Sequence, residues 1–165
     1  MGPWDVMSAH FVDRKGPPPG LSSFTKIRLG WISSEQVVQV RPGETREIML
    51  WPLAEKGDVL AVKIPLNADQ YYLVENRQPI KYDKVLPDSG ILVIKVDPNA
   101  VEGTGTARIM DADPASPNFQ HATYRPDRKN RKKFVDRENG VAVVALSADG
   151  KNQRILVTTP GNADQ

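Results

Sequence analysis

The chain contains no cysteine. Disulfide bonds, thiolate zinc sites and cysteine nucleophiles are therefore excluded. The absence is compatible with a bacterial or archaeal protein that works outside the cytoplasm. Residues 1–20 also lack the basic and apolar regions of a signal peptide, so no leader is expected within this chain.

Long apolar runs and a dominant charge of one sign are also missing. No stretch approaches the length that a membrane-spanning helix needs, so no membrane span is expected. The 22 basic and 20 acidic side chains leave a net charge of +2, which is too even to indicate a polyanionic partner for the whole protein. Nucleic acid is therefore not an expected partner.

Histidine is scarce, and the common catalytic motifs are absent. The chain has two histidines, His10 and His121, far apart in sequence, whereas a zinc site needs three or four ligands that converge. His10 is interpreted as an exposed or hydrogen-bonded loop residue. No nucleophile elbow, phosphate-binding loop or dinucleotide fingerprint is present, and residues 103–106 (Gly-Thr-Gly-Thr) are interpreted as a turn.

What remains is an ordinary globular composition with many turn residues. A length of 165 residues, 39% apolar and 25% charged, predicts one folded unit. The 14 prolines and 12 glycines favour short strands separated by turns. We divide the unit into residues 1–34, a turn, a proline-rich loop and a short helix, and residues 35–165, an all-β subdomain.

The first 34 residues contain one helix pattern. Prolines and glycines in residues 13–20 predict a stiff loop. Ser22 or Ser23 can cap the helix that follows, and Gly30 supplies a left-handed stop. Trp31 and Ile32 are then expected to begin the packing against a sheet. Three aromatic residues are predicted to lie in the core: Trp4, Phe11 and Trp31.

Short runs rich in β-branched and aromatic residues follow from position 35 onward. These strand-length runs cover residues 37–40, 47–51, 59–64, 71–76, 91–96, 141–146 and 154–158. Residues 41–44 predict a turn, and residues 148–151 predict a C-terminal hairpin. We expect a mainly β protein, an antiparallel β-sandwich or barrel-like sheet of about seven to eight strands with one short N-terminal helix. Residues 91–96 are nearly all apolar, which predicts a strand covered on both faces.

Two groups of charged residues need an interpretation. Glu75 and Arg77 project from the same face of a strand because side chains alternate, so a partly buried, structural ion pair is predicted. Residues 125–134 form the densest basic run, flanked by aromatic residues. Binding of a nucleic-acid backbone there is one hypothesis, but a solvated loop is favoured because acidic residues interrupt the run and no nucleic-acid-binding motif accompanies it.

Several motifs in order resemble one known family. They are GPWDVMS at residues 2–8, PPPGLS at 17–22, KIRLGWI at 26–32, YLVENRQ at 72–78, YD at 82–83, LPDSGILV at 86–93 and VD at 96–97, with weaker matches at 112–113 and 139–141. This order resembles the part of immune inhibitor A-like secreted zinc metallopeptidases that follows the zinc helix. The chain departs from the family at Asp88, where a glycine is usual, and at Lys95, where a histidine is usual.

The resemblance implies a role for Met7 as the methionine of a Met-turn, supported by Asp5, beneath a metal held elsewhere. The HExxH helix that would carry the zinc ligands and the general base is not in this chain. The chain is therefore expected to bind no zinc and to be inactive alone, as the C-terminal, non-catalytic part of an enzyme that hydrolyses peptides. The resemblance also implies an extracellular or cell-surface location, and a partner in the missing catalytic half or a separate chain that carries it.

Calcium is a further expectation from the family. Asp97, Asp111 and Asp113 lie near glycine- and proline-rich loops, where their oxygen atoms are candidate calcium ligands. The favoured interpretation is that they are solvated, because no EF-hand spacing is present. An alternative to the whole enzyme interpretation is a free-standing β-sandwich module, binding or structural, derived from that family.

Overall fold

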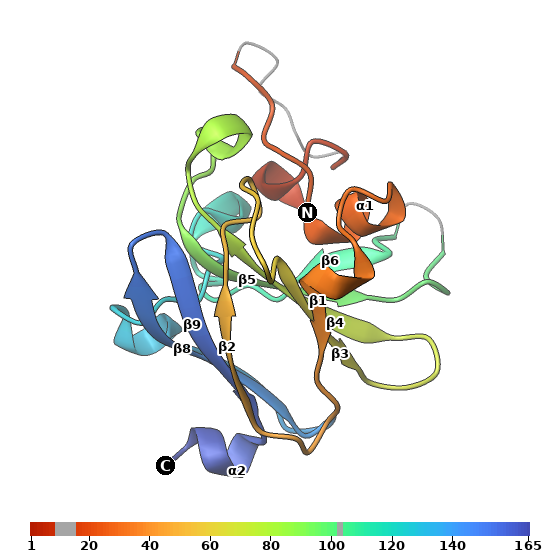
Figure 1. The fold of residues 1–165 in the computed structure, drawn as a ribbon, viewed down its shortest axis with the longest axis vertical. Helices are drawn as coiled ribbons and strands as arrows, with labels where there is room; N and C mark the ends of the chain where they lie inside the picture. The colour runs from red at the N-terminus through yellow and green to blue at the C-terminus, as the bar shows by residue number, and fades with distance from the viewer. Residues whose placement is uncertain (9–15, 102–103) are drawn as a thin grey trace.

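The computed structural model describes residues 1–8, 16–101 and 104–165 (Figure 1). The interpretations of His10, Phe11, Gly103 and the start of the proline-rich loop fall outside these ranges. No helix in the described ranges is long and apolar enough to cross a membrane.

Two β-sheets face one another, which confirms the predicted mainly β, sandwich-like fold. One sheet has five strands in the order β1-β3-β4-β5-β6, and the other has four in the order β2-β9-β8-β7. The strands are β1 Val37–Gln39, β2 Arg46–Leu50, β3 Ala61–Pro65, β4 Tyr71–Arg77, β5 Gly90–Val96, β6 Ala107–Ile109, β7 Lys133–Asp136, β8 Val141–Asp149 and β9 Asn152–Thr158. In Figure 1 the N-terminal segment lies at one end of the molecule and the C-terminal helix at the other.

Details of the predicted sheet need correction. The described residues form nine strands rather than seven to eight, because β6 and β7 have only three and four residues and show no apolar run. The pairing is not wholly antiparallel, since β1 runs parallel to β3. The strands that the structure describes form two separate sheets and do not close into a barrel.

The two predicted turns connect the strands differently. In the turn at residues 41–44, Glu44 N donates to Arg41 O at 3.1 Å and Gly43 has a φ of 89°. That turn carries the chain from one sheet to the other. The predicted C-terminal hairpin is formed by β8 and β9, which pair up to Asp149 and Asn152 around Gly150.

Helices are few and short. The α-helix α1 spans Ser23–Arg28, with Ser22 as its N-cap and Gly30 beyond it at a φ of 71°, as predicted. A second α-helix, α2, spans Pro160–Ala163 near the C-terminus. The 3-10 helices are η1 Gly2–Trp4, η2 Ser34–Gln36, η3 Lys81–Asp83, η4 Pro117–Phe119 and η5 Lys129–Arg131.

The main core fills the space between the sheets. Alternate residues of the five-stranded sheet, such as Val62 and Val93, face alternate residues of the four-stranded sheet, such as Val143 and Ile155. All four are completely buried. Aromatic rings contribute as well, since Tyr72 and Phe134 meet edge to face with ring centroids 5.0 Å apart.

A second core covers the outer face of the five-stranded sheet. Trp4 packs there with Leu92 and Ile94 of β5, and Phe24 and Ile27 of α1 pack against this cluster. Strand β5 is therefore buried on both faces, as its apolar sequence predicts. This second core places the N-terminal segment on the five-stranded sheet.

The prediction that Trp31 lies in the core is wrong. Trp31 is 66% exposed, whereas Ile32 is 5% exposed. Gly30 turns the chain at the end of α1, and Ile32 then enters a small cluster with Leu53 and Leu60. The side chain of Trp31 is left at the surface.

Gly90, the first residue of β5, lies where only glycine fits. It has a φ of 134°, and a Cβ atom added there would lie 2.7 Å from Tyr124 O. Gly90→Ala is expected to lower the free energy of unfolding by about 2–4 kcal/mol, because backbone strain adds to this clash. Urea unfolding measures the loss. Gly150→Ala is the matched control at about 1 kcal/mol, since Gly150 has a φ of 59° but open space around it; equal losses would contradict the prediction.

Candidate functional site

The N-terminal turn that contains Met7 is shaped by one buried carboxylate. Asp5 is 2% exposed, and its Oδ1 atom accepts a hydrogen bond from Met7 N at 2.8 Å. Ser8 N donates to Asp5 O at 2.9 Å and closes the turn. Asp5 therefore fixes the backbone that presents Met7.

The same carboxylate attaches the turn to the start of α1. Asp5 Oδ2 accepts hydrogen bonds from Ser22 N at 2.9 Å and from Thr25 Oγ1 at 3.1 Å. The N-terminus of a helix has amide groups without internal partners and favours negative charge. Asp5 thus joins two segments that are 17 residues apart in sequence.

A buried charge cluster joins this unit to the five-stranded sheet. Arg77 Nη1 donates to Glu75 Oε1 at 3.0 Å and to Trp4 O at 2.8 Å. Glu75 Oε2 accepts from Ser23 N, in the first turn of α1, at 2.7 Å. Glu75 and Arg77 are completely buried, so the predicted ion pair is present and more buried than predicted.

Sequence reasoning missed the third member of the cluster, Asp83. The Arg77 guanidinium donates from Nε to Asp83 Oδ2 at 3.0 Å and from Nη2 to Asp83 Oδ1 at 2.8 Å. Asp83 Oδ1 also accepts from Gly20 N at 2.9 Å, which ties down the end of the proline-rich loop. Burial alone would lower the pKa of Arg77, but the carboxylates of Glu75 and Asp83 outweigh it and raise that pKa.

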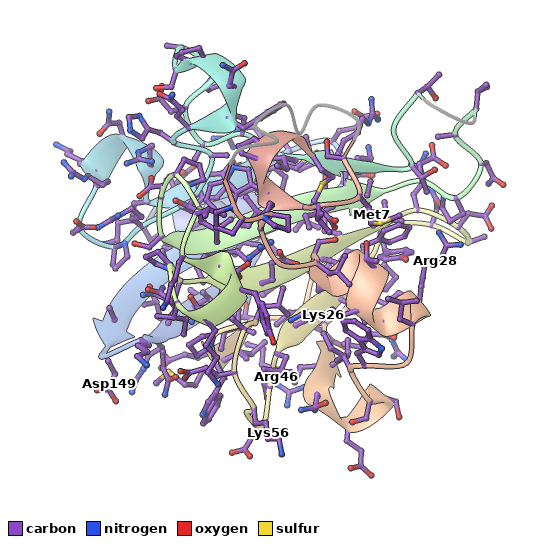
Figure 2. The ribbon with its side chains drawn as sticks, turned by 90° about the horizontal axis from the view of Figure 1, so that it is seen from above. Met7, Lys26, Arg28, Arg46, Lys56 and Asp149 are labelled. Atoms are coloured by element: carbon purple, nitrogen blue, oxygen red, sulfur yellow. The ribbon has the colours of Figure 1, made fainter. Side chains whose placement is uncertain are left out.

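Met7 itself is presented to solvent at the edge of a groove. Its side chain is 74% exposed, although the turn that carries it is anchored. The groove has a volume of about 440 Å³ and is lined in part by Met7, Phe24, Thr25, Ala107 and Phe119. In Figure 2, Met7 lies on the same side of the molecule as Lys26 and Arg28 of α1, and Asp149 at the tip of the β8–β9 hairpin lies on the opposite side.

Phe119 reaches the groove from an unusual backbone conformation. Asn118 and Phe119 have φ angles of 55° and 56°. Asparagine tolerates this region, but a bulky residue such as phenylalanine seldom adopts it. Phe119 O accepts from Trp4 Nε1 at 2.8 Å, and the ring lies against Gly2. The strained segment therefore places an aromatic ring beside the N-terminal segment, and strain of this kind is concentrated at functional sites.

The three candidate calcium ligands are not brought together. Asp97 follows β5, and its N–H donates to Thr106 O at 2.8 Å, just before β6. Asp111 and Asp113 follow the other end of β6, and β5 and β6 are antiparallel. In the part of the chain that the structure describes, no three His, Asp or Glu side chains are arranged to hold a metal ion. The described residues therefore offer no ligand set for zinc.

An Asp-Ser-His group lies after β6, and no motif in the sequence indicates it. Ser116 Oγ lies 2.9 Å from Asp113 Oδ2 and 2.9 Å from His121 Nδ1. A catalytic triad uses both ring nitrogens, one for the carboxylate and one for the serine. Here the same nitrogen, Nδ1, faces both Ser116 and Asp113, the latter at 3.6 Å, so the group does not have the geometry of a catalytic triad.

The interpretation of residues 125–134 as a solvated loop is wrong for several of its members. Arg131 is 8% exposed, and its Nη1 donates to Asp88 Oδ2 at 2.7 Å. Arg125 Nη1 donates to Asp88 Oδ1 at 2.8 Å. Phe134 belongs to β7 and to the main core. The carboxylate of Asp88, which is 10% exposed, draws Arg125 and Arg131 of the basic run inward. The spacing of these residues in the sequence does not indicate this contact.

Asp88 makes stability depend on pH. Burial would raise its pKa, but hydrogen bonds from Arg131, Ser89 N and Arg125 outweigh burial and hold that pKa below its usual value. A carboxyl group whose pKa is lower in the folded protein than in the unfolded protein stabilises the fold at pH values above its unfolded pKa of about 4. This stabilisation is lost as the pH falls through the pKa of the folded protein. Asp88→Asn is expected to lower the free energy of unfolding by about 2 kcal/mol at pH 7. The difference in this free energy between the variant and the wild type should become smaller below about pH 4.

Urea unfolding at several pH values measures this difference. Asp127→Asn is the control, because Asp127 also receives a hydrogen bond from Arg125 but its side chain is 55% exposed. Its expected loss is under about 1 kcal/mol at any pH. If the loss of stability in Asp88→Asn did not change with pH, the stabilising role given to the Asp88 carboxylate would be contradicted.

Comparison with known proteins gives no match to a family model, to a curated protein or to a solved structure.

Proposed function

We propose that this chain is the C-terminal, non-catalytic part of an immune inhibitor A-like zinc metallopeptidase domain, which hydrolyses peptide bonds outside the cell or at its surface. The zinc ligands and the general base would come from an HExxH helix in an upstream catalytic half or in a separate chain. Zinc would supply an activated water there. The described residues of this chain would supply the support beneath that site.

The presentation of Met7 is the observation that carries the proposal. Its backbone is held by Asp5, and Asp5 is in turn linked through Ser22 to α1. Yet the Met7 side chain is 74% exposed. A rigidly held apolar side chain at the surface is typical of a contact that another part of a protein completes.

The groove beside Met7 supports the same proposal. Phe24 and Phe119 add aromatic surface to it, and Phe119 is held there in a strained conformation. Both come from elements fixed on the five-stranded sheet, by the second core and by the hydrogen bond from Trp4. The catalytic half would cover Met7 and this aromatic surface.

The test is to capture the natural product from its source cells with an antibody against the β8–β9 hairpin. The expected product has an intact mass well above 18.3 kDa or is held by a second chain, and it cleaves peptides in a way that a zinc chelator abolishes. A product of 18.3 kDa with no chelator-sensitive activity would contradict the proposal and favour a free-standing β-sandwich module.

Met7→Ala separates a functional role from a folding role. The exposed side chain contributes little to folding, so the free energy of unfolding should change by less than about 0.5 kcal/mol. Activity of the captured enzyme should fall at least about tenfold, because Met7 would support the metal ligands. Leu29→Ala is the control, since Leu29 is also exposed, at 53%, and does not line the groove. Equal activity of the two variants would contradict the role of Met7.

A further inference from the structure

A second groove lies between the edge strands of the two sheets. Strand β6 ends the five-stranded sheet and β7 ends the four-stranded sheet. The groove between them has a volume of about 850 Å³ and is lined in part by Tyr72, Lys95, Arg108, Phe134, Asp136 and Arg137. It is large enough for a small polar ligand and open to solvent.

Two cations face this groove from adjacent strands. Lys95 of β5 is directly opposite Arg108 of β6 in the antiparallel pairing. Backbone hydrogen bonds join Asp97 to Thr106 and Met110 to Val93, on either side of this pair. The alternation of an antiparallel ladder therefore makes it a hydrogen-bonded pair, with Cα atoms roughly 5.5 Å apart and both side chains on one face.

The face that carries the two cations is the one that forms the main core. Tyr72 is opposite Lys95 on the other neighbouring strand, and it belongs to that core. Val93, two residues before Lys95, is completely buried there. Lys95 and Arg108 thus extend the inner face of the sheet to its edge, where like charges directly opposite each other are unfavourable.

Three carboxylates line the groove, Asp136, Glu138 and Asp164, and none of them pairs with Lys95 or Arg108. Within residues 1–8, 16–101 and 104–165, neither Lys95 nor Arg108 takes part in an ion pair or a side-chain hydrogen bond. Asp164 is paired with Lys133 and Arg137 on the β7 side.

Asp136, the acidic residue closest to the core, is bound by neutral groups. Its Oδ2 atom accepts from Tyr72 Oη at 2.7 Å and from Asn139 Nδ2 at 2.6 Å. These bonds fix the carboxylate on the β7 side of the groove. No described residue uses the side-chain donors of Lys95 or Arg108, so these donors are open to a ligand.

We propose that Lys95 and Arg108 bind a doubly charged oxyanion, phosphate or sulfate, at the mouth of this groove. A guanidinium offers a planar fork of donors that suits such an anion, and an ammonium adds a point charge. The two positive charges match the charge of the anion, and the bound anion offsets the repulsion between them. The site does not depend on the proposed peptidase function, and the resemblance assigns nothing to Lys95, since the family has a histidine there.

Inward-pointing charges at a sheet edge, here Arg108 on the edge strand β6 and Lys95 on its neighbour β5, can also serve only to prevent sheets from pairing edge to edge. That role needs no ligand. It predicts that removing the two charges promotes self-association and leaves the response to phosphate unchanged. Binding measurements on the wild type and on a charge-matched control therefore separate the two roles.

The test is titration of the isolated, isotope-labelled chain with inorganic phosphate at constant ionic strength, followed by amide chemical shifts. We expect saturable shifts in β5, β6 and β7, binding at least about tenfold weaker in Lys95→Gln/Arg108→Gln, and unchanged binding in Lys129→Gln/Lys132→Gln, which removes two exposed charges elsewhere. Unsaturable shifts, or equal binding by both double variants, would overturn the proposal.

A second arm identifies the source of the anion. The same titration with a phosphoserine peptide compares an esterified phosphate with the free ion. Tighter binding of the peptide would assign the site to a phosphate carried on a larger molecule, and equal binding would assign it to the free anion. The binding of neither, in a chain shown to be folded by its amide spectrum, would leave edge protection as the role of the two residues and overturn the proposal.

Discussion

Replacing Arg77 by methionine is expected to lower the free energy of unfolding by about 3–5 kcal/mol. The guanidinium is completely buried and contacts two carboxylates, Glu75 and Asp83, that are themselves buried. Without the guanidinium, both carboxylates would remain buried away from water but would have no positive charge beside them. Trp4 O would lose its hydrogen bond from Arg77 Nη1 as well.

The control is the same substitution at an exposed ion pair. On the four-stranded sheet, Arg154 Nη1 lies 3.1 Å from Glu47 Oε1. Both side chains are about half exposed, at 50% and 52%. Arg154→Met should cost at most about 1 kcal/mol. Urea unfolding followed by circular dichroism compares the two. Similar losses would show that the buried cluster does not hold the N-terminal segment to the sheet.

Trp4→Ala is expected to have an effect of similar size, about 3–5 kcal/mol. Trp4 is completely buried in the second core, against β5 and the helix α1. Its removal would leave a large cavity and would also leave Phe119 O without the hydrogen bond from the indole. We expect the N-terminal segment to detach before the sheets unfold.

Trp31→Ala is the matched control for the loss of an indole. Trp31 is 66% exposed, so the change should stay within about 0.5 kcal/mol. Amide hydrogen exchange tests the order of unfolding, because protection of Ser22 and Ser23 should fall in Trp4→Ala while β8 and β9 stay protected. Uniform loss of protection, or equal effects of the two tryptophans, would contradict the role given to Trp4.

Elements with strong local signals could be predicted from the sequence. Apolar runs predict seven of the strands, and the turn residues around Gly150 predict the last hairpin. The period of two in β4 places Glu75 and Arg77 on one face, and the structure confirms their pairing. Ser22 and Gly30 mark the ends of α1.

Features that depend on distant contacts could not be predicted in this way. Strand β6 is three residues long and exists because it pairs with β5. Asp83 ends the 3-10 helix η3, and Asp88 lies in the loop before β5. Only the fold brings them to Arg77 and Arg131. Trp31 is exposed because Ile32, and not its neighbour, fills the adjacent cluster. Hydrophobicity alone does not decide between two adjacent residues.

Only part of the candidate site has a signal in the sequence. The motifs point to Asp5 and Met7, and the hydrogen bond from Met7 N to Asp5 Oδ1 holds the turn that contains them. The groove depends on Phe119, which is more than 100 residues away in sequence from its partner Trp4. The pairing of Lys95 with Arg108 requires the register of β5 and β6, which no local pattern gives.

Cross-linking from position 7 tests the central claim most directly. A photoreactive phenylalanine analogue would replace Met7 in the source cells, with replacement of Leu29 as the control. The account predicts a cross-link from position 7 to a polypeptide segment that contains HExxH, upstream in the same chain or in a second chain, and no such cross-link from position 29. A chain that folds but gives no cross-link to such a segment from position 7 would contradict the account.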